Sequence, residues 1–439
     1  MPVKSARWVL VLLIVTMAAC SIPFAATRSP SADNSSPADS SYVMVGGQNG
    51  TWFKFNQAPR LEKIDLTNYS IASLIPAPTE GTVWGGGWNG SQWLISGWGE
   101  DNGPNGSNPY IFLYNGQNQV DGGSLDQYQA ENTWHGGDIF AASANGKEWL
   151  LSGLGSGNLT TDNAFYYGSN HMSLALFDGS NFTDLSSIVP EQRDAILYAN
   201  AWNGEYWLIG GGYQYNGALF SFDGKKIVDL TQRLEQAVGY FGSVQALSWN
   251  GYYWLIGGVN FLVSYDGRNF TDLTAKLDSV LEMNGGCCSS VNAIAWDGEG
   301  WILGGGTPIA QTDYGHAWLA KYANGIFTDL TAEVSPKIND QLPDSSILSI
   351  AATTGTWIIG GYFNGKGSLY EYTEGSLSNI SSLVSNYTYV DWIGAHIFRL
   401  HRPTFGKPNS IIDLAEFNMP LILTQDWIIS TIRPRNLKF

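Results

Sequence analysis

The chain has 439 residues, of which 44% are apolar, 14% are charged and 18 are tryptophan. Its formal net charge of −16 comes from 38 acidic and 22 basic residues, so the chain lacks the basic footprint that nucleic-acid phosphates require. Because the charged fraction is well below the usual quarter or so, we expect a surface of neutral polar residues, as suits an extracellular protein.

The first residues are typical of an exported protein. Lys4 and Arg7 precede the apolar run WVLVLLIVTMAA, which is too short to span a bilayer comfortably and has the length of a signal-peptide core. The sequence MAAC then resembles a lipobox, which implies a signal peptide over residues 1–20 and lipidation of Cys20. Plain secretion and an uncleaved anchor are the alternatives. Residues 21–41 are rich in Ser and Pro and predict a linker.

A tryptophan followed by aliphatic residues and glycine recurs through the body of the chain. Clear copies are AWNGEYWLIGGG from Ala201, SWNGYYWLIGG from Ser248 and AWDGEGWILGGG from Ala295. Their spacing is close to the period of propeller blades, which is roughly 40–50 residues. The anchoring tryptophans are Trp93, Trp149, Trp207, Trp254, Trp301 and Trp357.

Each complete unit predicts four short strands. In residues 243–274 these are SVQALSW, YYWLIGG, FLVSYDG and NFTDLT, with Asn-Gly and Asp-Gly turns in the first and last pairs. We expect Trp202 and Trp207 to pair across the first turn, and the glycines to end the second strand where a side chain would meet the next blade. Asp272 and its equivalents fall on the outermost strand, where charge discourages edge-to-edge association. We interpret FDGSN, residues 177–181, as a turn, because it lacks the further carboxylates of a calcium loop.

The two ends of the repeat region complement each other. Six units are complete, the segment YVMVGGQNGTWFKFN…KIDLT has only the three later strands, and TYVDWIG matches a first strand through Trp392 and Gly394. The sequence therefore predicts an all-β fold over residues 42–400: a seven-bladed β-propeller of four-stranded antiparallel blades, closed by the N- and C-terminal strands in one blade. Residues 401–439 differ in composition and form a C-terminal tail whose structure the sequence does not predict.

The repeat resembles those of kelch and galactose-oxidase-type propellers in its double glycine and its period. It departs from kelch in lacking the later spaced Tyr and Trp, and in placing Trp before the glycines. It is similar in cadence to secreted propeller-repeat proteins of archaea and bacteria, through WNGxxWLIGG and YDGxxFxDLT. The resemblance implies the fold and says almost nothing about chemistry.

In such a fold the residues just before each first strand ring one mouth of the central channel, on the face that carries the variable loops. Aromatic and acidic side chains, with one arginine and one histidine, suit a polar ligand such as a glycan. The residues predicted at this mouth are Glu80, Trp134, His135, Arg193, Asp194, Tyr240, Phe241, Cys287, Cys288 and Asp344.

Cys287 and Cys288 are adjacent in GGCCSS. If Cys20 is lipidated or removed, they are the only cysteines left in an oxidising compartment, and we expect a vicinal disulfide between them. Free thiols, a metal-bound pair and an intermolecular bridge stay open, because ring strain makes vicinal disulfides rare.

The five histidines have no metal-binding spacing, and the sequence contains no nucleophile-elbow, zinc or phosphate-loop motif. We therefore expect no metal and no cofactor. The predicted function is that of an extracellular, membrane-tethered, monomeric binding module for a glycan or a protein partner. The alternative is a propeller enzyme, either a glycan hydrolase or lyase or an oxidoreductase, with its site at the channel mouth.

Overall fold

The computed structural model describes residues 42–47, 52–56, 70–73, 81–99, 108–115, 119–124, 137–156, 170–190, 195–213, 216–281, 290–308, 315–335, 344–353, 356–373, 375–384 and 390–396. The chain divides into two units, Met1–Ala38 and Asp39–Phe439, and every described residue belongs to the second. The predicted signal peptide, Cys20, the linker and the tail lie outside the described residues. Within the described ranges, no helix is long and apolar enough to cross a membrane.

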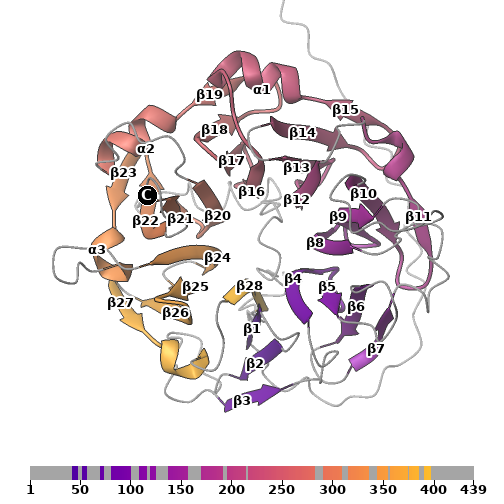
Figure 1. The fold of residues 1–439 in the computed structure, drawn as a ribbon, viewed down its shortest axis with the longest axis horizontal. Coiled ribbons are helices and arrows are strands. Elements are labelled where there is room, and N and C mark those ends of the chain that lie inside the picture. Colours follow the sequence, from indigo (N-terminus) through magenta and orange to yellow (C-terminus); the bar gives the residue numbers. More distant parts are fainter. Residues whose placement is uncertain are drawn as a thin grey trace, which may run out of the picture. The chain divides into compact units, whose positions relative to one another are not determined.

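The described residues form an all-β propeller of four-stranded antiparallel blades (Figure 1). Six blades are each built from four consecutive strands, and the first strand of each blade contacts the first strands of the neighbouring blades. The first two blades are β4 (Gly81–Trp88), β5 (Trp93–Gly99), β6 (Asn108–Tyr114) and β7 (Gln119–Ser124), then β8 (Gly137–Ala144), β9 (Trp149–Ser156), β10 (Asn170–Phe177) and β11 (Phe182–Asp184). The next two are β12 (Ile196–Trp202), β13 (Trp207–Tyr213), β14 (Asn216–Phe222) and β15 (Ile227–Asp229), then β16 (Val244–Trp249), β17 (Trp254–Gly258), β18 (Phe261–Tyr265) and β19 (Phe270–Asp272). The last two are β20 (Ser290–Trp296), β21 (Trp301–Pro308), β22 (Gly315–Ala323) and β23 (Ile326–Asp329), then β24 (Ser345–Thr353), β25 (Thr356–Phe363), β26 (Lys366–Thr373) and β27 (Ser376–Asn379).

A further sheet joins strands from the two ends of the described chain, in the order β28-β1-β2-β3. Its strands are β1 (Tyr42–Gly47), β2 (Trp52–Asn56), β3 (Ser70–Ser73) and β28 (Val390–His396). The outermost strand, β3, has the sequence SIAS, whereas the segment KIDLT that was predicted for this strand lies outside the described residues. The register of β28 also differs from the prediction, which aligned Trp392 with Trp202. In the sheet, Ala395 occupies the position of Trp202, because it pairs with Val43 as Trp202 pairs with Trp207. Trp392 is therefore three residues away from the tryptophan position with which it was aligned.

A side-chain acceptor and a glycine fix the turn between the first two strands in five of the blades. Asn203 Oδ1 accepts hydrogen bonds from the backbone N–H groups two and three residues later, at 2.9 and 2.8 Å, and Gly204 has a φ of +97°. The predicted pairing of Trp202 with Trp207 is confirmed, with ring centroids 4.4 Å apart. The interpretation of FDGSN as a turn is confirmed as well, because Asp178 Oδ1 accepts the same two backbone hydrogen bonds. Side chains that act like Asn203 at the other first turns are Asn89, Asn145, Asn250 and Asp297.

The paired glycines of the second strand are required by two different contacts. A Cβ on Gly210 would lie 2.4 Å from Val244 of the next blade, so the predicted collision between blades is confirmed for this glycine. A Cβ on Gly211 would lie 2.1 Å from the carbonyl oxygen of Ile196, in the first strand of its own blade. That strand is bulged at this point, since its register skips Tyr198. The second glycine therefore accommodates the bulge.

Each anchoring tryptophan is at most 1% exposed, and several of them hydrogen-bond to the preceding blade. The indole Nε1 of Trp149 donates to the carbonyl oxygen of Gly87 at 2.7 Å. In two later blades the acceptor is the hydroxyl of a tyrosine just before the second strand, with Trp254 donating to Tyr206 and Trp301 to Tyr253, both at 3.2 Å. These contacts join neighbouring blades through their most buried side chains.

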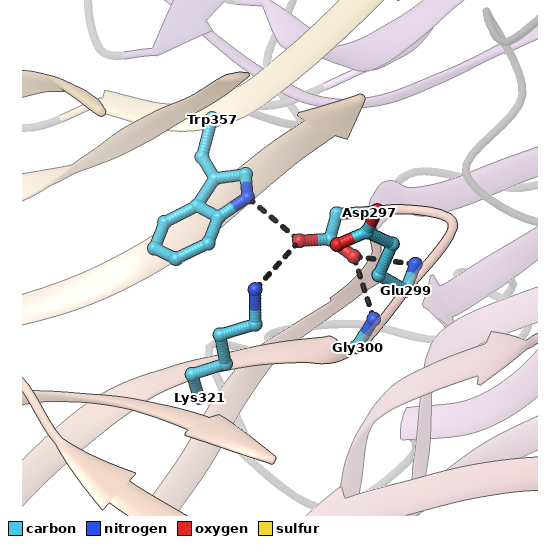
Figure 2. Close-up of polar contacts among 5 residues, drawn as sticks. All are labelled: Asp297, Glu299, Gly300, Lys321 and Trp357. Carbon is cyan, nitrogen blue, oxygen red and sulfur yellow. Dashed lines mark hydrogen bonds and ion pairs between the residues drawn. The ribbon is translucent and has the colours of Figure 1, made fainter. Parts of the chain in front are cut away.

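The fourth link of this kind uses a carboxylate (Figure 2). Trp357 Nε1 donates to Oδ2 of the buried Asp297 at 3.2 Å, and Lys321 Nζ lies 3.3 Å from the same oxygen. Oδ1 of Asp297 accepts hydrogen bonds from the backbone N–H groups of Glu299 and Gly300, at 2.8 and 2.6 Å. Gly300 occupies the position of the tyrosines in the other blades, and a Cβ there would lie 2.9 Å from Lys321 Cε. Asp297 and Lys321 thus occupy the space that a tyrosine fills elsewhere.

Short helices follow the fourth strands of five blades, and they were not predicted from the sequence. The Asp-Leu-Thr sequence ends the strand: Asp272 Oδ1 accepts from the Thr274 N–H at 2.8 Å, and Thr274 Oγ1 accepts from the Leu262 N–H at 3.0 Å. This aspartate therefore has a local hydrogen-bonding role beside any effect of its charge at the sheet edge. The helices are α1 (Thr231–Val238), α2 (Thr274–Val280), α3 (Thr331–Val334), and the 3-10 helices η3 (Ser186–Ile188) and η4 (Ser381–Val384).

Candidate functional site

The first strands of the six consecutive blades each carry one bulged residue. At every bulge the pairing register skips one position, and the side chain at that position is partly exposed although the residue before it is buried. A bulge re-aims a side chain out of the regular alternation of the strand. We call these six side chains the inner-rim residues: Trp84, Phe140, Tyr198, Gln245, Asn292 and Leu348.

Three consecutive inner-rim residues are aromatic and contact one another across blades. The ring centroids of Trp84 and Phe140 are 5.3 Å apart with the planes tilted by 39°, and those of Phe140 and Tyr198 are 5.4 Å apart in an edge arrangement. Such offset and edge geometries are the favourable ones for aromatic pairs. Burial raises the pKa of Tyr198, and the nearby Tyr213 raises it further. We call Trp84, Phe140 and Tyr198 the aromatic arc.

The next two inner-rim residues are amides linked by serines. Ser290 Oγ lies 2.7 Å from Gln245 Oε1 and also contacts Asn292 Oδ1, so its single proton is shared between two acceptors. Asn292 Nδ2 donates to Ser346 Oγ at 3.0 Å and to the carbonyl oxygen of Ile347 at 3.1 Å. Within the described part of the chain, the amide nitrogen of Gln245 has no hydrogen-bond acceptor. The network therefore holds the Gln245 side chain by its oxygen and leaves its N–H groups available.

Asp138 lies two residues before Phe140 on β8, and burial raises its pKa to about 6. The strands that pack against β8 are β4, β5, β6, β9 and β12, and none of them contains a Lys, Arg, His, Asp or Glu. Their only titratable side chains are Tyr110, Tyr114 and Tyr198. No hydrogen bond or ion pair joins the Asp138 carboxyl group to another described residue. In the other five blades the equivalent residues are uncharged: Thr82, Ile196, Ser243, Ser290 and Ser346.

The strands nearest these side chains lack positive charge. None of β4, β8, β12, β16, β20, β24 and β28 contains Lys or Arg, and their acidic residues are Asp138 and Asp391. In β28 the register passes from Val390 to Trp392, which places Asp391 at the bulged position of that strand. Among the described residues, the carboxyl group of Asp138 favours a neutral polar or a positively charged ligand over an anion.

Three of the ten predicted mouth residues are described. Tyr240 is 67% exposed, whereas Phe241 is buried in the core, edge-on to Phe261 at 5.2 Å between centroids, so its side chain packs the fold instead of lining a mouth. Asp344 is half-buried, and its Oδ1 accepts a hydrogen bond from the Gly315 N–H at 3.4 Å. No group of three or more metal-ligating side chains occurs among the described residues. The predicted residues outside the described ranges are Glu80, Trp134, His135, Arg193, Asp194, Cys287 and Cys288, the last two with their expected disulfide.

The sequence did contain a signal for the inner-rim residues. When the first strands are aligned, aliphatic and small residues precede and follow one position that varies among Trp, Phe, Tyr, Gln, Asn and Leu. A single variable position inside a repeated strand indicates a side chain that the fold itself does not determine. The mouth residues were predicted just before the first strands, so this position within the strands was missed.

No protein-family model matches the chain, and no curated protein matches its sequence. The chain is similar to several solved structures, each with a TM-score below 0.5. The β-propeller domain of the Trilobed protease from Pyrococcus furiosus is 12% identical over 68% of this chain and 84% of that chain, with a TM-score of 0.35. The acylaminoacyl peptidase of Pyrococcus horikoshii is 10% identical over 79% of this chain and 53% of that chain, with a TM-score of 0.42, so the chain matches about half of its length. Sqt1 from Chaetomium thermophilum is 12% identical over 70% of this chain and 73% of that chain, with a TM-score of 0.38.

Proposed function

We propose that this protein is an extracellular binding module that holds a glycan against its inner-rim residues without catalysis. The observation that carries this function is the aromatic arc, a run of three partly exposed rings from three blades. A sugar ring presents an apolar C–H face that packs on aromatic rings, while its hydroxyl groups need a few placed polar partners. The open N–H groups of Gln245 and the carboxyl group of Asp138 would supply such partners.

We propose further that the sheet β28-β1-β2-β3 is a seventh blade that closes the ring. In support, β28 contacts β24 on one side and β4 on the other, and it carries a bulge as the other first strands do. The proposal also includes a kelch-like relationship, tethering of the protein to the membrane through a lipid on Cys20, and a monomeric state. A closed ring would hold the inner-rim residues on a rigid frame, as a preformed ligand site requires.

The alternative is a glycan hydrolase, and one observation favours it. A carboxyl group with a pKa of about 6 is suited to donate a proton near neutral pH, and Asp138 has this property. In that case Asp138 would act as the general acid on a sugar bound along the aromatic arc. Incubation with the glycans that bind, followed by analysis for shortened products, distinguishes hydrolysis from binding alone.

Glycan binding is expected to depend on the aromatic arc. A glycan array followed by titration calorimetry should show that Trp84→Ala and Tyr198→Ala each weaken binding roughly tenfold, the equivalent of about 1.4 kcal/mol. Tyr252→Ala is the matched control, because Tyr252 is 74% exposed in the turn between β16 and β17, is not an inner-rim residue and should leave binding unchanged. Thermal unfolding of each variant excludes misfolding. Binding that survives both arc substitutions would place the site elsewhere.

Closure of the ring is expected to make β1 depend on β28. In hydrogen exchange, the amides of residues 42–47 should be slow to exchange in the full chain and fast in a chain that ends at Val384. A chain that ends at His396 keeps β28 and serves as the control. Equal protection of β1 in both shortened chains would show that β28 does not close the ring.

A further inference from the structure

A carboxyl group that meets no counter-charge among the described residues lies beside the aromatic arc. Asp138 precedes Phe140 by two residues on β8, a separation of about 7 Å along a strand. The strands packed against β8 bring no cationic side chain, and the seven first strands contain no Lys or Arg. A half-buried carboxylate in such surroundings is costly unless a cation approaches it. The described part of the fold provides no such cation.

Aromatic rings attract cations as carboxylates do. The face of a Trp, Tyr or Phe ring binds an ammonium group within about 6 Å of its centroid. The aromatic arc offers three contiguous rings, each of them partly exposed. A positively charged group placed over these rings next to β8 would meet the ring faces and Asp138 together.

The arrangement of acidic residues around the arc is consistent with such a ligand. In the order of the contacting first strands, the bulged residues are Asp391 on β28, Trp84 on β4, Phe140 on β8 and Tyr198 on β12. The register therefore places one aspartate at the bulge before the arc, and Asp138 lies within it. Along the described first strands, the positions in and just before the arc thus include two aspartates and no lysine or arginine.

We call Gln245 and Asn292 the amide side of the inner rim. This side favours a ligand that carries hydrogen-bond acceptors in addition to a charge. Gln245 is held through its oxygen by Ser290 and offers N–H groups to an acceptor. A sugar hydroxyl accepts such hydrogen bonds, whereas a simple alkylammonium ion has no acceptor. A ligand that uses both sides of the rim therefore combines hydroxyl groups with an ammonium group.

We propose that the inner rim selects a glycan with free amino groups, such as an oligomer of glucosamine, and places an ammonium group against the aromatic arc and Asp138. This selectivity rests on the proposed glycan-binding function of the same site. The remaining hydroxyl groups of the sugar then lie within reach of the amide side of the rim.

Two oligosaccharides with the same backbone test this selectivity. The full-length protein is titrated near pH 7 with hexamers of β-1,4-linked glucosamine and of N-acetylglucosamine, which differ only in whether the amine is free or acetylated. The free-amine hexamer should bind at least tenfold more tightly. Asp138→Asn should reduce this preference to less than threefold, measured as the ratio of the two affinities within the same variant.

A general attraction between an acidic protein and a polycation must be separated from this effect. Asp266 is an exposed turn carboxylate far from the first strands in sequence, so Asp266→Asn removes the same charge and should leave the preference unchanged. An equal loss of preference in Asp266→Asn and Asp138→Asn would overturn the proposed selectivity. Equal affinities for the two hexamers would overturn it as well and would leave glycan binding intact. Failure of both hexamers to bind, with other neutral glycans also inactive, would count against the proposed function itself.

Discussion

Asp138→Asn is expected to make the protein more stable at pH 7 and not at pH 4. Burial raises the pKa of Asp138 from 3.8 to about 6, so the folded state binds this proton more tightly than the unfolded state does. Between these two pKa values, the unfolded chain ionises while the folded protein resists ionisation. The free energy of unfolding therefore decreases as the pH rises from about 4 to about 6, and the full penalty is present above that range.

The size of the effect follows from the shift. A displacement of about two pKa units corresponds to about 3 kcal/mol, at 1.36 kcal/mol per unit. Urea unfolding followed by tryptophan fluorescence should therefore show Asp138→Asn stabilised relative to the parent by up to about 3 kcal/mol at pH 7, and by close to zero at pH 4. The difference between the two pH values is the critical quantity, because any cost of burying the new amide is common to both.

Asp266→Asn serves as the matched control for this experiment too. Backbone hydrogen bonds from Asn269 and Arg268 lower the pKa of Asp266, so its carboxylate favours the folded state as the pH rises. Its replacement should not stabilise the protein at pH 7. If Asp138→Asn gained no stability at pH 7 beyond its change at pH 4, the carboxyl group would not carry this penalty in the folded protein. A stabilising replacement would mean that the chain retains a costly carboxyl group, as functional sites often do.

The strands could be predicted from the sequence because their signals are local. Paired tryptophans around an Asn-Gly turn define a hairpin, and Trp202 and Trp207 pair as expected. The helices were missed because Asp-Leu-Thr reads as the end of a strand, and the helical continuation depends on Leu234 packing into the core behind it. The register of β28 was misplaced because Trp392 occupies a position that holds a small residue, such as Ala199, in other blades.

The candidate site was harder to predict than the fold, for a physical reason. A β-bulge shifts the pairing by one residue, and no residue type marks it within a single strand, so Tyr198 and Gln245 read as ordinary members of an alternating strand until the first strands of all blades are aligned. The raised pKa of Asp138 likewise depends on which strands pack against β8, and this is a tertiary property. Phe241 shows the converse, since an aromatic residue before a first strand belongs to the core.

Asp297→Asn is expected to destabilise the protein by about 3 kcal/mol. Four donors converge on the two oxygens of the buried Asp297: two backbone N–H groups of the turn, the indole of Trp357 and the ammonium group of Lys321. An asparagine has one acceptor oxygen, so either the turn or the Trp357–Lys321 pair would face an amide N–H instead. Leaving buried donors unsatisfied costs about 1–3 kcal/mol each, and unpairing a buried charge costs more. Because the Lys321 side chain is 29% exposed, water replaces part of the interaction that its ammonium group loses. We therefore expect a total loss of about 3 kcal/mol and not the larger cost of a fully buried unpaired charge.

The reverse substitution in the neighbouring blade is the control. Asn250 has the same turn position and accepts the same two backbone hydrogen bonds, but the tryptophan of the next blade, Trp301, donates to Tyr253. Asn250→Asp keeps both turn hydrogen bonds and removes nothing from Trp301, so it should change the free energy of unfolding by less than about 0.5 kcal/mol. Denaturant unfolding of both variants at pH 7 gives the comparison. An Asp297→Asn variant as stable as Asn250→Asp would show that the carboxylate does not join these blades.

A combined variant tests whether the carboxylate replaces the tyrosine of the other blades. Gly300→Tyr introduces the hydroxyl that Trp254 and Trp301 use as their acceptor, and Lys321→Ser removes the side chain whose Cε would lie 2.9 Å from the new Cβ. Added to Asp297→Asn, these two changes should restore more than half of the lost stability, since Trp357 regains an acceptor and no buried charge remains. Additive losses in the triple variant would mean that the two solutions are not interchangeable. Recovery of stability would show that Asp297, Gly300 and Lys321 together replace the tyrosine that accepts the tryptophan hydrogen bond between the other blades.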